Sequence, residues 1–573
     1  MVKIPDAANK IPMMFRAQTA GRCQLQRILP ERKKAKEPQD VEQWASEWII
    51  KAYPTPPKFG NNVQSRHYTL TWRFVTNGGQ DDGIIRPAIG AYGWPYYPGS
   101  SMKGIFRSAC SPTQIQRYCG SENTLGDCVS GILRFHGGYP TDSSWQDNLV
   151  DIVHPQQDWQ VKESKKSSGA FALISLSAPE LEFGISSTIV LDDQEWDKIW
   201  QIWEKALSKG IGCRVSAGYG QVADASSQVL YSCRLHGRGM APTLLNGEGE
   251  FRPNMLRATI RSHALRIFGG LTDADTAQQL VQQLFGGVDG DGAVGLLGMK
   301  FETISIKIGN FGEGAYAVST YDVEGKLSWL LTQKFPEAQS ELLQKLIKGL
   351  TRFAMVFGGF GKSWRRADHR LFFPEYYDSE DDKPLIGCHW SWRGKRSLLN
   401  DVRVRNLARV GEFIQKEVLQ VAIDWMELQG VSPTPDHCAN WREAWHPQRV
   451  KVWGRLATDA DDCEAVLWLH QPYRQKLGRQ IPEGSIYKSS VTGFVGQETQ
   501  IGRLWHRMYP VVGLKKNPDN PNKPIIAKSP NYLELLTLFP DDSDEFEDFL
   551  HFLESEQKMF QLLWGDRLLP NQR

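Results

Sequence analysis

The chain has 573 residues, of which 41% are hydrophobic and 23% charged, and this is the composition of a folded protein with sizeable cores. It excludes a mainly disordered chain, a collagen-like fibre and a coiled coil, and no stretch approaches the roughly 18 consecutive apolar residues of a membrane span. The net charge of +2 neither requires nor excludes a nucleic-acid partner. The first residues lack an apolar signal core, and the nine cysteines are too irregularly spaced for a disulfide framework. Both features predict a cytoplasmic protein with no membrane partner.

The predicted elements of the first half fall into a leader and one folded unit. Residues 1–65 are predicted to form an N-terminal leader with a helix over 44–52. Residues 66–228 are predicted to form a first module. Its order is a strand over 68–75, an acidic loop over 77–83, a helix over 102–110, strands over 183–191, an amphipathic helix over 196–209 and a glycine-rich loop over 212–222.

The same order recurs in residues 229–375, which are predicted to form the core of a second module. A strand over 229–235 precedes a helix over 253–268, a strand over 301–308, a helix over 339–353 and a glycine-rich stretch over 358–361. Residues 376–573 contain a helix-like segment over 402–428 and a strand-like one over 450–456. They lack a clear copy of the basic helix start that both modules have. They are therefore predicted to be a C-terminal extension or insertion of the second module.

Two pairs of basic residues strengthen the case for an internal repeat. Lys103 and Arg107 are four residues apart, as are Arg257 and Arg261. The distance along the sequence from Lys103 to Arg257 therefore equals that from Arg107 to Arg261. Residues four apart share one face of a helix, so each pair is predicted to form a positive edge that binds RNA phosphates. In the first module, Ser100 and Ser101 stand at the helix start, where backbone N–H groups can bind a phosphate. The alternative without a binding function is a capped helix with a solvated basic edge.

The glycine-rich segments carry residues that suit RNA. Arg214 can pair with a phosphate, and Tyr219 can stack on a base. In the second copy the corresponding stretch is followed by a cluster of basic and aromatic residues, namely Lys362, Trp364, Arg365 and Arg366. Each segment alone could be an ordinary turn. Trp505, His506 and Arg507, further along, could stack on RNA or fill a core, and a core role is preferred.

These motifs, in this order, resemble those of the RAMP proteins of CRISPR–Cas effectors, which form the backbone subunits of type III complexes. The resemblance rests on residues 98–104 and 212–222 in the first module, and on residues 252–261 and 357–361 in the second. It covers roughly residues 66–375. The chain looks like a tandem fusion of two backbone modules, as in the fused III-D complexes. The resemblance implies an α+β fold of two ferredoxin-like (RRM-like) RAMP modules with insertions and a C-terminal extension, bound to guide RNA, target RNA and other effector subunits.

The resemblance also implies an activity. In target-cleaving members, an Asp in the loop after the first strand cuts target RNA with a divalent metal, and the 2′-hydroxyl of the target is the expected nucleophile. In this sequence that loop holds Asp82, the preferred catalytic residue, and its neighbour Asp81. Mg²⁺ or Mn²⁺ is the expected cofactor. The second module has Glu248 and Glu250 in the corresponding loop, and we expect it to bind RNA without cutting. The alternative reading of residues 81–83 is a simple turn.

A zinc site is a further hypothesis for the first module. Cys110, Cys119 and Cys128 are spaced by nine residues and His136 follows, and three thiolates with one imidazole suit tetrahedral zinc. Some RAMP proteins carry zinc in this region. The set lacks the usual pair of cysteines two residues apart, and buried cysteines without a ligand are the default alternative.

Two rival functions remain open. A non-catalytic RNA-binding scaffold would keep the RNA contacts, with an inert Asp loop. A guide-RNA-processing RAMP endonuclease would use a general-base histidine, for which His67 and His136 are the nearest candidates in the first module.

Overall fold

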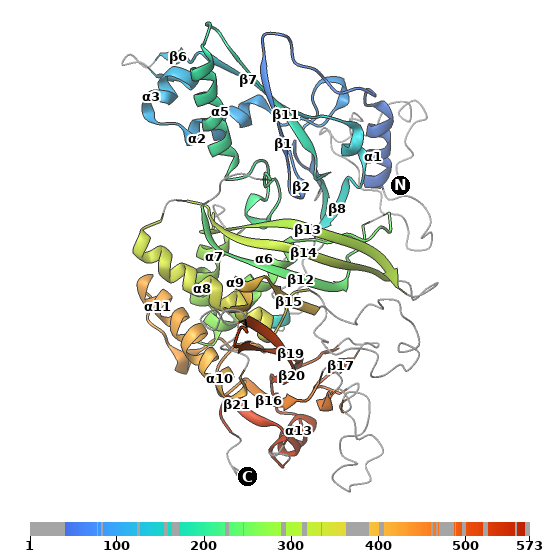
Figure 1. Ribbon diagram of the computed structural model, residues 1–573, viewed down its shortest axis with the longest axis vertical. Coiled ribbons are helices and arrows are strands. Elements are labelled where there is room, and N and C mark those ends of the chain that lie inside the picture. Colours follow the sequence, from blue (N-terminus) through green and yellow to red (C-terminus); the bar gives the residue numbers. More distant parts are fainter. Residues whose placement is uncertain are drawn as a thin grey trace, which may run out of the picture.

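The computed structural model describes residues 40–76, 78–81, 84–122, 127–153, 159–162, 171–223, 228–244, 246–287, 294–311, 318–333, 335–361, 389–399, 406–459, 462–465, 468, 486, 489–494, 500–518, 525–555 and 559–567. Three units follow one another along the long axis of the molecule, and each is built around an antiparallel sheet (Figure 1). The first unit lies at the top of the view and the third at the bottom.

The first unit has a three-stranded sheet with two helices. Its elements in chain order are β1 (Gln64–Thr69), α2 (Gly99–Ala109), β7 (Leu133–Pro140), β11 (Glu180–Ser187) and α5 (Asp193–Leu207), and its strand order is β1-β11-β7. Val222 makes an isolated antiparallel bridge with Leu70, just past the end of β1. The bridge stands where a fourth strand would follow α5 and pair with the first.

Most other elements of the first unit are insertions into this frame. A small sheet has the order β3-β4-β9-β8 and is formed by β3 (Gly79–Asp81), β4 (Ile84–Arg86), β8 (Val150–Val153) and β9 (Phe171–Ile174). Two strand pairs are β2 (Arg73–Phe74) with β10 (Leu176–Ser177) and β5 (Gly120–Glu122) with β6 (Cys128–Ser130). The helical segments are α1 (Asp40–Lys51), η3 (Ala91–Gly93), α3 (Pro112–Gln114), η4 (Ile115–Cys119), η5 (Ser143–Gln146), α4 (Trp159–Lys162) and η6 (Val215–Ala217).

The second unit has a complete four-stranded sheet in the order β13-β14-β12-β15. Its elements are β12 (Val229–Met240), α6 (Asn254–Gly269), α7 (Ala274–Phe285), β13 (Leu297–Phe311), β14 (Val318–Leu331), α8 (Glu337–Val356) and β15 (His389–Arg393). After β15 the chain forms α9 (Lys395–Leu399), α10 (Leu407–Glu412), η10 (Phe413–Leu419), α11 (Gln420–Leu428) and η11 (Pro435–His437). The helices η10 and α11 pack against α8 and so enlarge the second unit.

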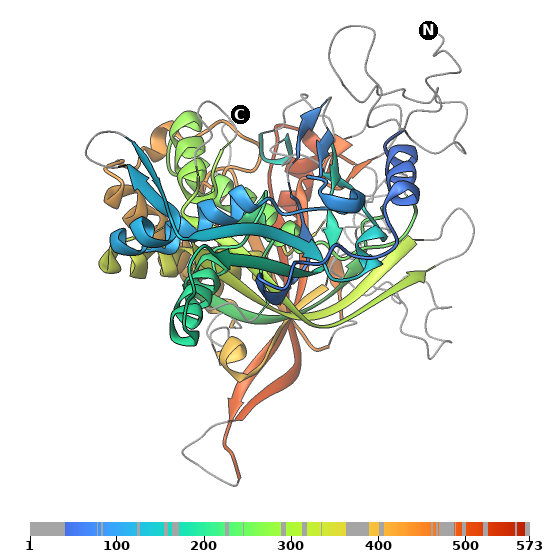
Figure 2. The ribbon, with the colours of Figure 1, turned by 90° about the horizontal axis from the view of Figure 1, so that it is seen from above.

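Residues 451–564 build a third sheet, in the order β19-β20-β16-β21. Its strands, with one helix before the last of them, are β16 (Lys451–Ala457), β19 (Leu504–Lys515), β20 (Ile525–Leu538), α13 (Asp544–Ser555) and β21 (Gln561–Trp564). A separate short pair is β17 (Gly493–Phe494) with β18 (Gln500–Ile501). The strands β19 and β20 are long, and their far ends project from the body of the molecule (Figure 2).

The second and third sheets therefore have the same strand order, with the first strand of each unit flanked by its third and fourth. The first unit keeps this order for its first three strands. The sequence analysis treated residues 376–573 as one extension of the second module. In the structure, β15 completes the second sheet, whereas β16 to β21 form a sheet of their own.

The helices predicted over 44–52, 102–110, 196–209, 253–268 and 339–353 are confirmed as α1, α2, α5, α6 and α8. Their apolar residues recur at helical spacing. In α5, for example, Trp200 and Trp203 are buried, while the Asp192 carboxylate accepts the N–H of Glu195 and so caps the helix. The strand predicted over 68–75 is divided into β1 and β2. The acidic run 541–548 contains the start of α13, where its negative charges favour the helix N-terminus.

Candidate nucleic-acid interface

The helix α2 presents an exposed basic edge, as the sequence predicts. Met102 and Phe106 are buried beneath it, and the predicted RNA-binding residues Ser100, Ser101, Lys103 and Arg107 are all exposed. Among the residues that the structure describes, no carboxylate pairs with Lys103 or Arg107. The edge therefore keeps its positive charge, next to the first helical turn, where the N–H of Gly99 donates to the Tyr96 hydroxyl.

The corresponding pair on α6 is placed differently, and the prediction of a second exposed basic edge is wrong. Arg261 is only 8% exposed, and Arg257 is half-buried. The Arg257 guanidinium donates to the carbonyl of Phe285 and lies 5.7 Å from the centre of its ring. Burial, together with the nearby positive charges of Arg261 and Arg214, lowers the pKa of Arg257 to about 10. The cause is α7, which packs against α6 and ends at Phe285.

The glycine-rich loop of the first unit reaches this same place. Arg214 contributes to the electrostatic field at Arg257, so the loop and α6 bring three guanidinium groups together at the boundary between the first and second units. The loop needs glycine at Gly220, whose φ is +60° and where a Cβ atom would lie 1.8 Å from the carbonyl oxygen of Ile211. Arg214 itself has a φ of 60°.

Tyr219 does not face solvent, which corrects the prediction that it stacks on RNA. Its side chain is fully buried, its ring centre lies 4.5 Å from that of Trp72, and its hydroxyl donates to Asp151 over 2.8 Å. Burial and the Asp151 carboxylate raise its pKa well above the usual value. Tyr219 is a core residue of the loop, and only Arg214 of this predicted pair is partly accessible.

Several predicted residues lie outside the described part of the chain. These are Asp82 and the basic and aromatic cluster Lys362, Trp364, Arg365 and Arg366. Asp81 is described only in its backbone, which pairs with Ile84 as β3 and β4 form a hairpin on either side of residues 82–83.

A buried ion-pair network joins the first and second units beside the glycine-rich loop. Glu250 of the second unit accepts from Arg73 of the first over 2.6 Å and from Arg252 over 3.0 Å. Arg252 in turn pairs with Asp151 over 2.8 Å. The side chains of Arg73 and Asp151 are fully buried. Glu250, one of the two acidic residues in the loop that corresponds to the Asp loop, thus serves as the anion of this network.

The four predicted zinc ligands do not converge. Cys110 and Cys119 contact each other, and burial, followed by this contact, raises the pKa of Cys110 to about 12. Cys128 is exposed on β6, and the Nε2 atom of His136 lies 2.8 Å from the Ser186 hydroxyl instead. The spacing of nine residues places Cys110 and Cys119 at the ends of two adjoining helical segments, but it leaves Cys128 across a strand pair.

This arrangement predicts very unequal thiol reactivity. Cys128 is expected to react with iodoacetamide at neutral pH at least about 100-fold faster than Cys110, because a thiol with a raised pKa has little reactive thiolate. Mass-spectrometric mapping of alkylated peptides over time measures both rates in one sample. A shared zinc ion would instead protect Cys110, Cys119 and Cys128 together until a chelator is added.

The two histidines proposed as general bases have ordinary surroundings. His67 is exposed and lies 3.5 Å from Glu180 and 3.8 Å from Glu182. Burial lowers the pKa of His136, whose ring is held by Ser186. In the part of the chain that the structure describes, no contact joins His67 or His136 to the basic residues of α2.

Within the described residues, one group of three metal-binding side chains does converge: Cys463, His506 and Glu534 of the third unit. The sequence analysis did not single out Cys463 or Glu534, because neither belongs to a short motif. The preference for a core role at residues 505–507 is confirmed, since Trp505, His506 and Arg507 are 3%, 3% and 4% exposed. None of the helices that the structure describes has the length and apolar content to cross a membrane.

No family model matches the chain, and neither does any curated protein. Two solved structures resemble it in part. A chain of the type III-B Cmr-beta complex bound to cognate target RNA, solved by cryo-electron microscopy, is 20% identical with a TM-score of 0.22. That match covers 28% of this chain and 58% of the other, so this chain spans little more than half of that relative. Crystalline Cmr6 from Pyrococcus furiosus is 14% identical with a TM-score of 0.19, and the match covers 29% of this chain and 98% of Cmr6.

Proposed function

We propose that the chain is an RNA-binding backbone subunit of a type III CRISPR effector complex. The observation that carries this proposal is the placement of the repeated motifs. In both the first and the second unit, a helix with two basic residues follows the first strand, and a glycine-rich loop follows the second long helix. The second unit has the order strand, helix, strand, strand, helix, strand of the ferredoxin-like fold, with α7 inserted, and the first unit has the same order with an isolated bridge in place of its last strand. We extend the proposal to the third unit, so that the chain carries three such modules.

The exposed edge of α2 is the proposed contact with guide RNA. Lys103 and Arg107 supply charge for phosphate groups, while Ser100, Ser101 and the first-turn N–H groups supply hydrogen-bond donors. Such contacts fix the position of the RNA backbone without reading its sequence. This suits a subunit that has to accept any guide.

The buried arginines of the second unit are proposed to act at longer range. Arg257 and Arg261 are enclosed, but their charges add to that of Arg214, which is half-buried. A positive cluster beneath a loop raises the local potential and attracts a polyanion without direct contact. In this proposal, guide RNA runs over α2 and the glycine-rich loop, and the cluster Lys362, Trp364, Arg365 and Arg366 supplies further contacts.

We further propose that the first module cleaves target RNA at Asp82, with Asp81 as its neighbour and Mg²⁺ or Mn²⁺ as the cofactor. A carboxylate in the hairpin between β3 and β4 would bind the metal or accept the proton of the target's 2′-hydroxyl. The second module is proposed to bind RNA without cutting. The partners are guide RNA, target RNA and other effector subunits, in the cytoplasm.

Changing both Lys103 and Arg107 to Ala tests the guide contact. We expect about 30-fold weaker binding of a repeat–spacer RNA, because two phosphate contacts of about 1 kcal/mol each are lost. The slope of log affinity against log salt concentration should fall by about 1.4, since each contact with a single strand contributes about 0.7. Fluorescence anisotropy at several salt concentrations measures both quantities.

The matched control changes two exposed lysines on helices of the second unit, Lys345 on α8 and Lys416 on η10, to Ala. This control removes the same charge and should keep the affinity and the salt dependence. Equal binding by the two double variants at every salt concentration would contradict the α2 interface. Co-expression with a repeat–spacer array tests the wider assignment: discrete guide RNAs should copurify with the unaltered chain, and random cellular RNA would count against a type III subunit.

A further inference from the structure

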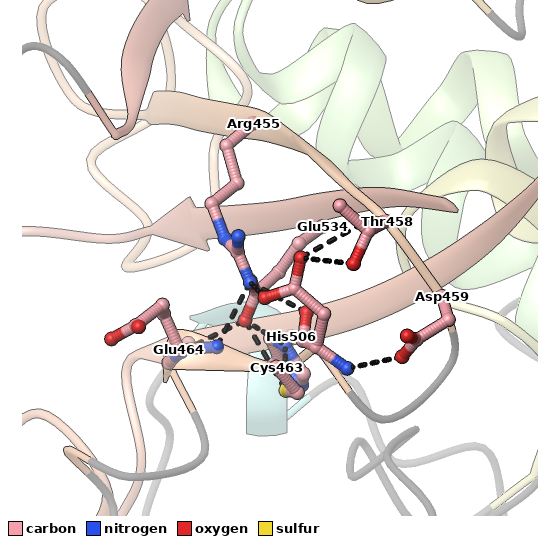
Figure 3. Close-up of polar contacts among 9 residues, drawn as sticks. Arg455, Thr458, Asp459, Cys463, Glu464, His506 and Glu534 are labelled. Carbon is pink, nitrogen blue, oxygen red and sulfur yellow. Dashed lines mark hydrogen bonds and ion pairs between the residues drawn. The ribbon is translucent and has the colours of Figure 1, made fainter. Parts of the chain in front are cut away.

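The third unit holds a compact set of three side chains in its core (Figure 3). Cys463 lies in the segment after β16, His506 lies on β19, and Glu534 lies on the central strand β20. They are 6%, 3% and 0% exposed. His506 and Glu534 point to the face of the sheet that α13 covers, beside an apolar cluster that includes Leu536 and Phe549.

The three ligand atoms form a triangle of the size that a zinc ion requires. The His506 Nε2 atom lies 3.1 Å from Glu534 Oε1 and 3.5 Å from Cys463 Sγ, and Cys463 Sγ lies 3.2 Å from Glu534 Oε1. Tetrahedral zinc binds sulfur at about 2.3 Å and nitrogen or oxygen at about 2.0–2.1 Å. These bond lengths place nitrogen and oxygen about 3.3 Å apart, and sulfur about 3.5 Å from either. A small outward movement of Glu534 would therefore admit one ion.

Hydrogen bonding alone leaves the carboxylate oxygen crowded. Glu534 Oε1 faces three donors: the Cys463 thiol, the His506 ring and the Ala465 N–H, which lies 2.8 Å away. One carboxylate oxygen has about two lone-pair positions. A metal ion removes this excess, because it replaces the protons of the thiol and the imidazole and leaves the second lone pair to Ala465.

The surroundings of Glu534 resemble the supporting shell of a metal ligand. Its other oxygen accepts from Arg455 over 2.5 Å and from the Glu464 N–H over 3.2 Å, and these bonds fix the plane of the carboxylate. Burial raises the pKa of Glu534, but His506, Arg455 and the Ala465 N–H outweigh this effect and keep its pKa below the usual value. Arg455 also pairs with Asp462 over 2.8 Å. The two positive charges of a divalent ion would be balanced by the Cys463 thiolate and the Glu534 carboxylate. Arg455 and Asp462 neutralise each other, so the site as a whole is electrically neutral.

We propose that Cys463, His506 and Glu534 bind one zinc ion, which fastens the segment after β16 to the strands β19 and β20 of the third sheet. The donor set of one sulfur, one imidazole nitrogen and one carboxylate oxygen suits zinc over magnesium or calcium, which prefer oxygen ligands alone. Three protein ligands would leave the fourth tetrahedral position open, so the structural role that we assign to the ion rests on the burial of the ligands and not on their number. This proposal does not depend on the RNA-binding function.

Metal analysis of the full-length chain, purified without chelators, tests the site. We expect about one zinc ion per chain, because three preorganised buried ligands bind the ion upon folding. Cys463→Ser should abolish zinc binding. Cys233→Ser changes a buried cysteine of β12 outside the site, and Cys119→Ser changes one of the cysteines in the first unit; both should keep the zinc.

Cobalt substitution supplies a readout that does not depend on whether Cys463→Ser folds. Titration of the unaltered metal-free chain with Co²⁺ should produce a thiolate-to-cobalt absorption band that added Zn²⁺ removes, and Cys119→Ser should show the same band. Three results would overturn the proposal: an unaltered chain that holds neither zinc nor cobalt, zinc retained in folded Cys463→Ser, or zinc lost in Cys119→Ser.

Discussion

Glu250→Ala is expected to lower the free energy of unfolding by about 3–5 kcal/mol, which is the typical cost of breaking a buried ion pair from one side. The Arg73 side chain is fully buried and its Nε atom donates to Glu250, which also binds Arg252. Without Glu250, Arg73 keeps its bonds to the Asn148 carbonyl and the Ser175 hydroxyl but loses its carboxylate partner. The effect should fall on the boundary between the first and second units, because Arg73 and Glu250 belong to different units.

Chemical denaturation, followed by tryptophan fluorescence, measures the loss, and the first transition is the relevant one because a chain of several units need not unfold in one step. Glu250→Gln keeps an acceptor for Arg73 and should cost less than Glu250→Ala. The control is Glu412→Ala, which breaks the exposed pair between Glu412 and Lys416 and should cost little. Equal midpoints for Glu250→Ala and Glu412→Ala would show that the network does not hold the units together.

Local patterns in the sequence were sufficient for the helices that set the frame of the first two units. The apolar spacing of α5 and α8 and the helix start before Met102 each depend on residues within a few turns. The exposure of Lys103 and Arg107 also follows from local spacing, since Met102 and Phe106 occupy the buried face of the same helix.

Contacts between distant segments could not be predicted in this way. Arg257 has the same spacing to Arg261 as Lys103 has to Arg107, but α7, an inserted helix, encloses it. The sequence places Tyr219 in a glycine-rich loop, where an exposed side chain is expected. In the structure Asp151 and Trp72, which are distant in the sequence, enclose it. The third sheet was missed for the same reason. A long connection separates β16 from β19, and the pairing of Arg455 with Glu534 spans 79 positions.

Asp82→Ala is expected to slow the cleavage of target RNA by about 10²–10⁴-fold, which is the usual contribution of a side chain that transfers a proton or holds the metal. Guide-RNA affinity should not change, because the proposed guide contacts lie on α2 and the glycine-rich loop. Asp81→Ala should have a smaller effect, since Asp81 is proposed as a neighbour of the catalytic residue. Cleavage should stop when a chelator removes Mg²⁺ or Mn²⁺ and resume when the metal is restored.

The assay is single-turnover cleavage of a labelled target RNA by the complex reconstituted with guide RNA, with binding measured in parallel. Glu248→Ala is the matched control, because Glu248 is an exposed carboxylate in the corresponding loop of the second unit. It should cleave at the rate of the unaltered chain. If Asp82→Ala cleaves as fast as Glu248→Ala, Asp82 is not the catalytic residue. If the unaltered complex binds target RNA without cutting it in the presence of Mg²⁺ or Mn²⁺, the chain is a scaffold whose function rests on its RNA contacts.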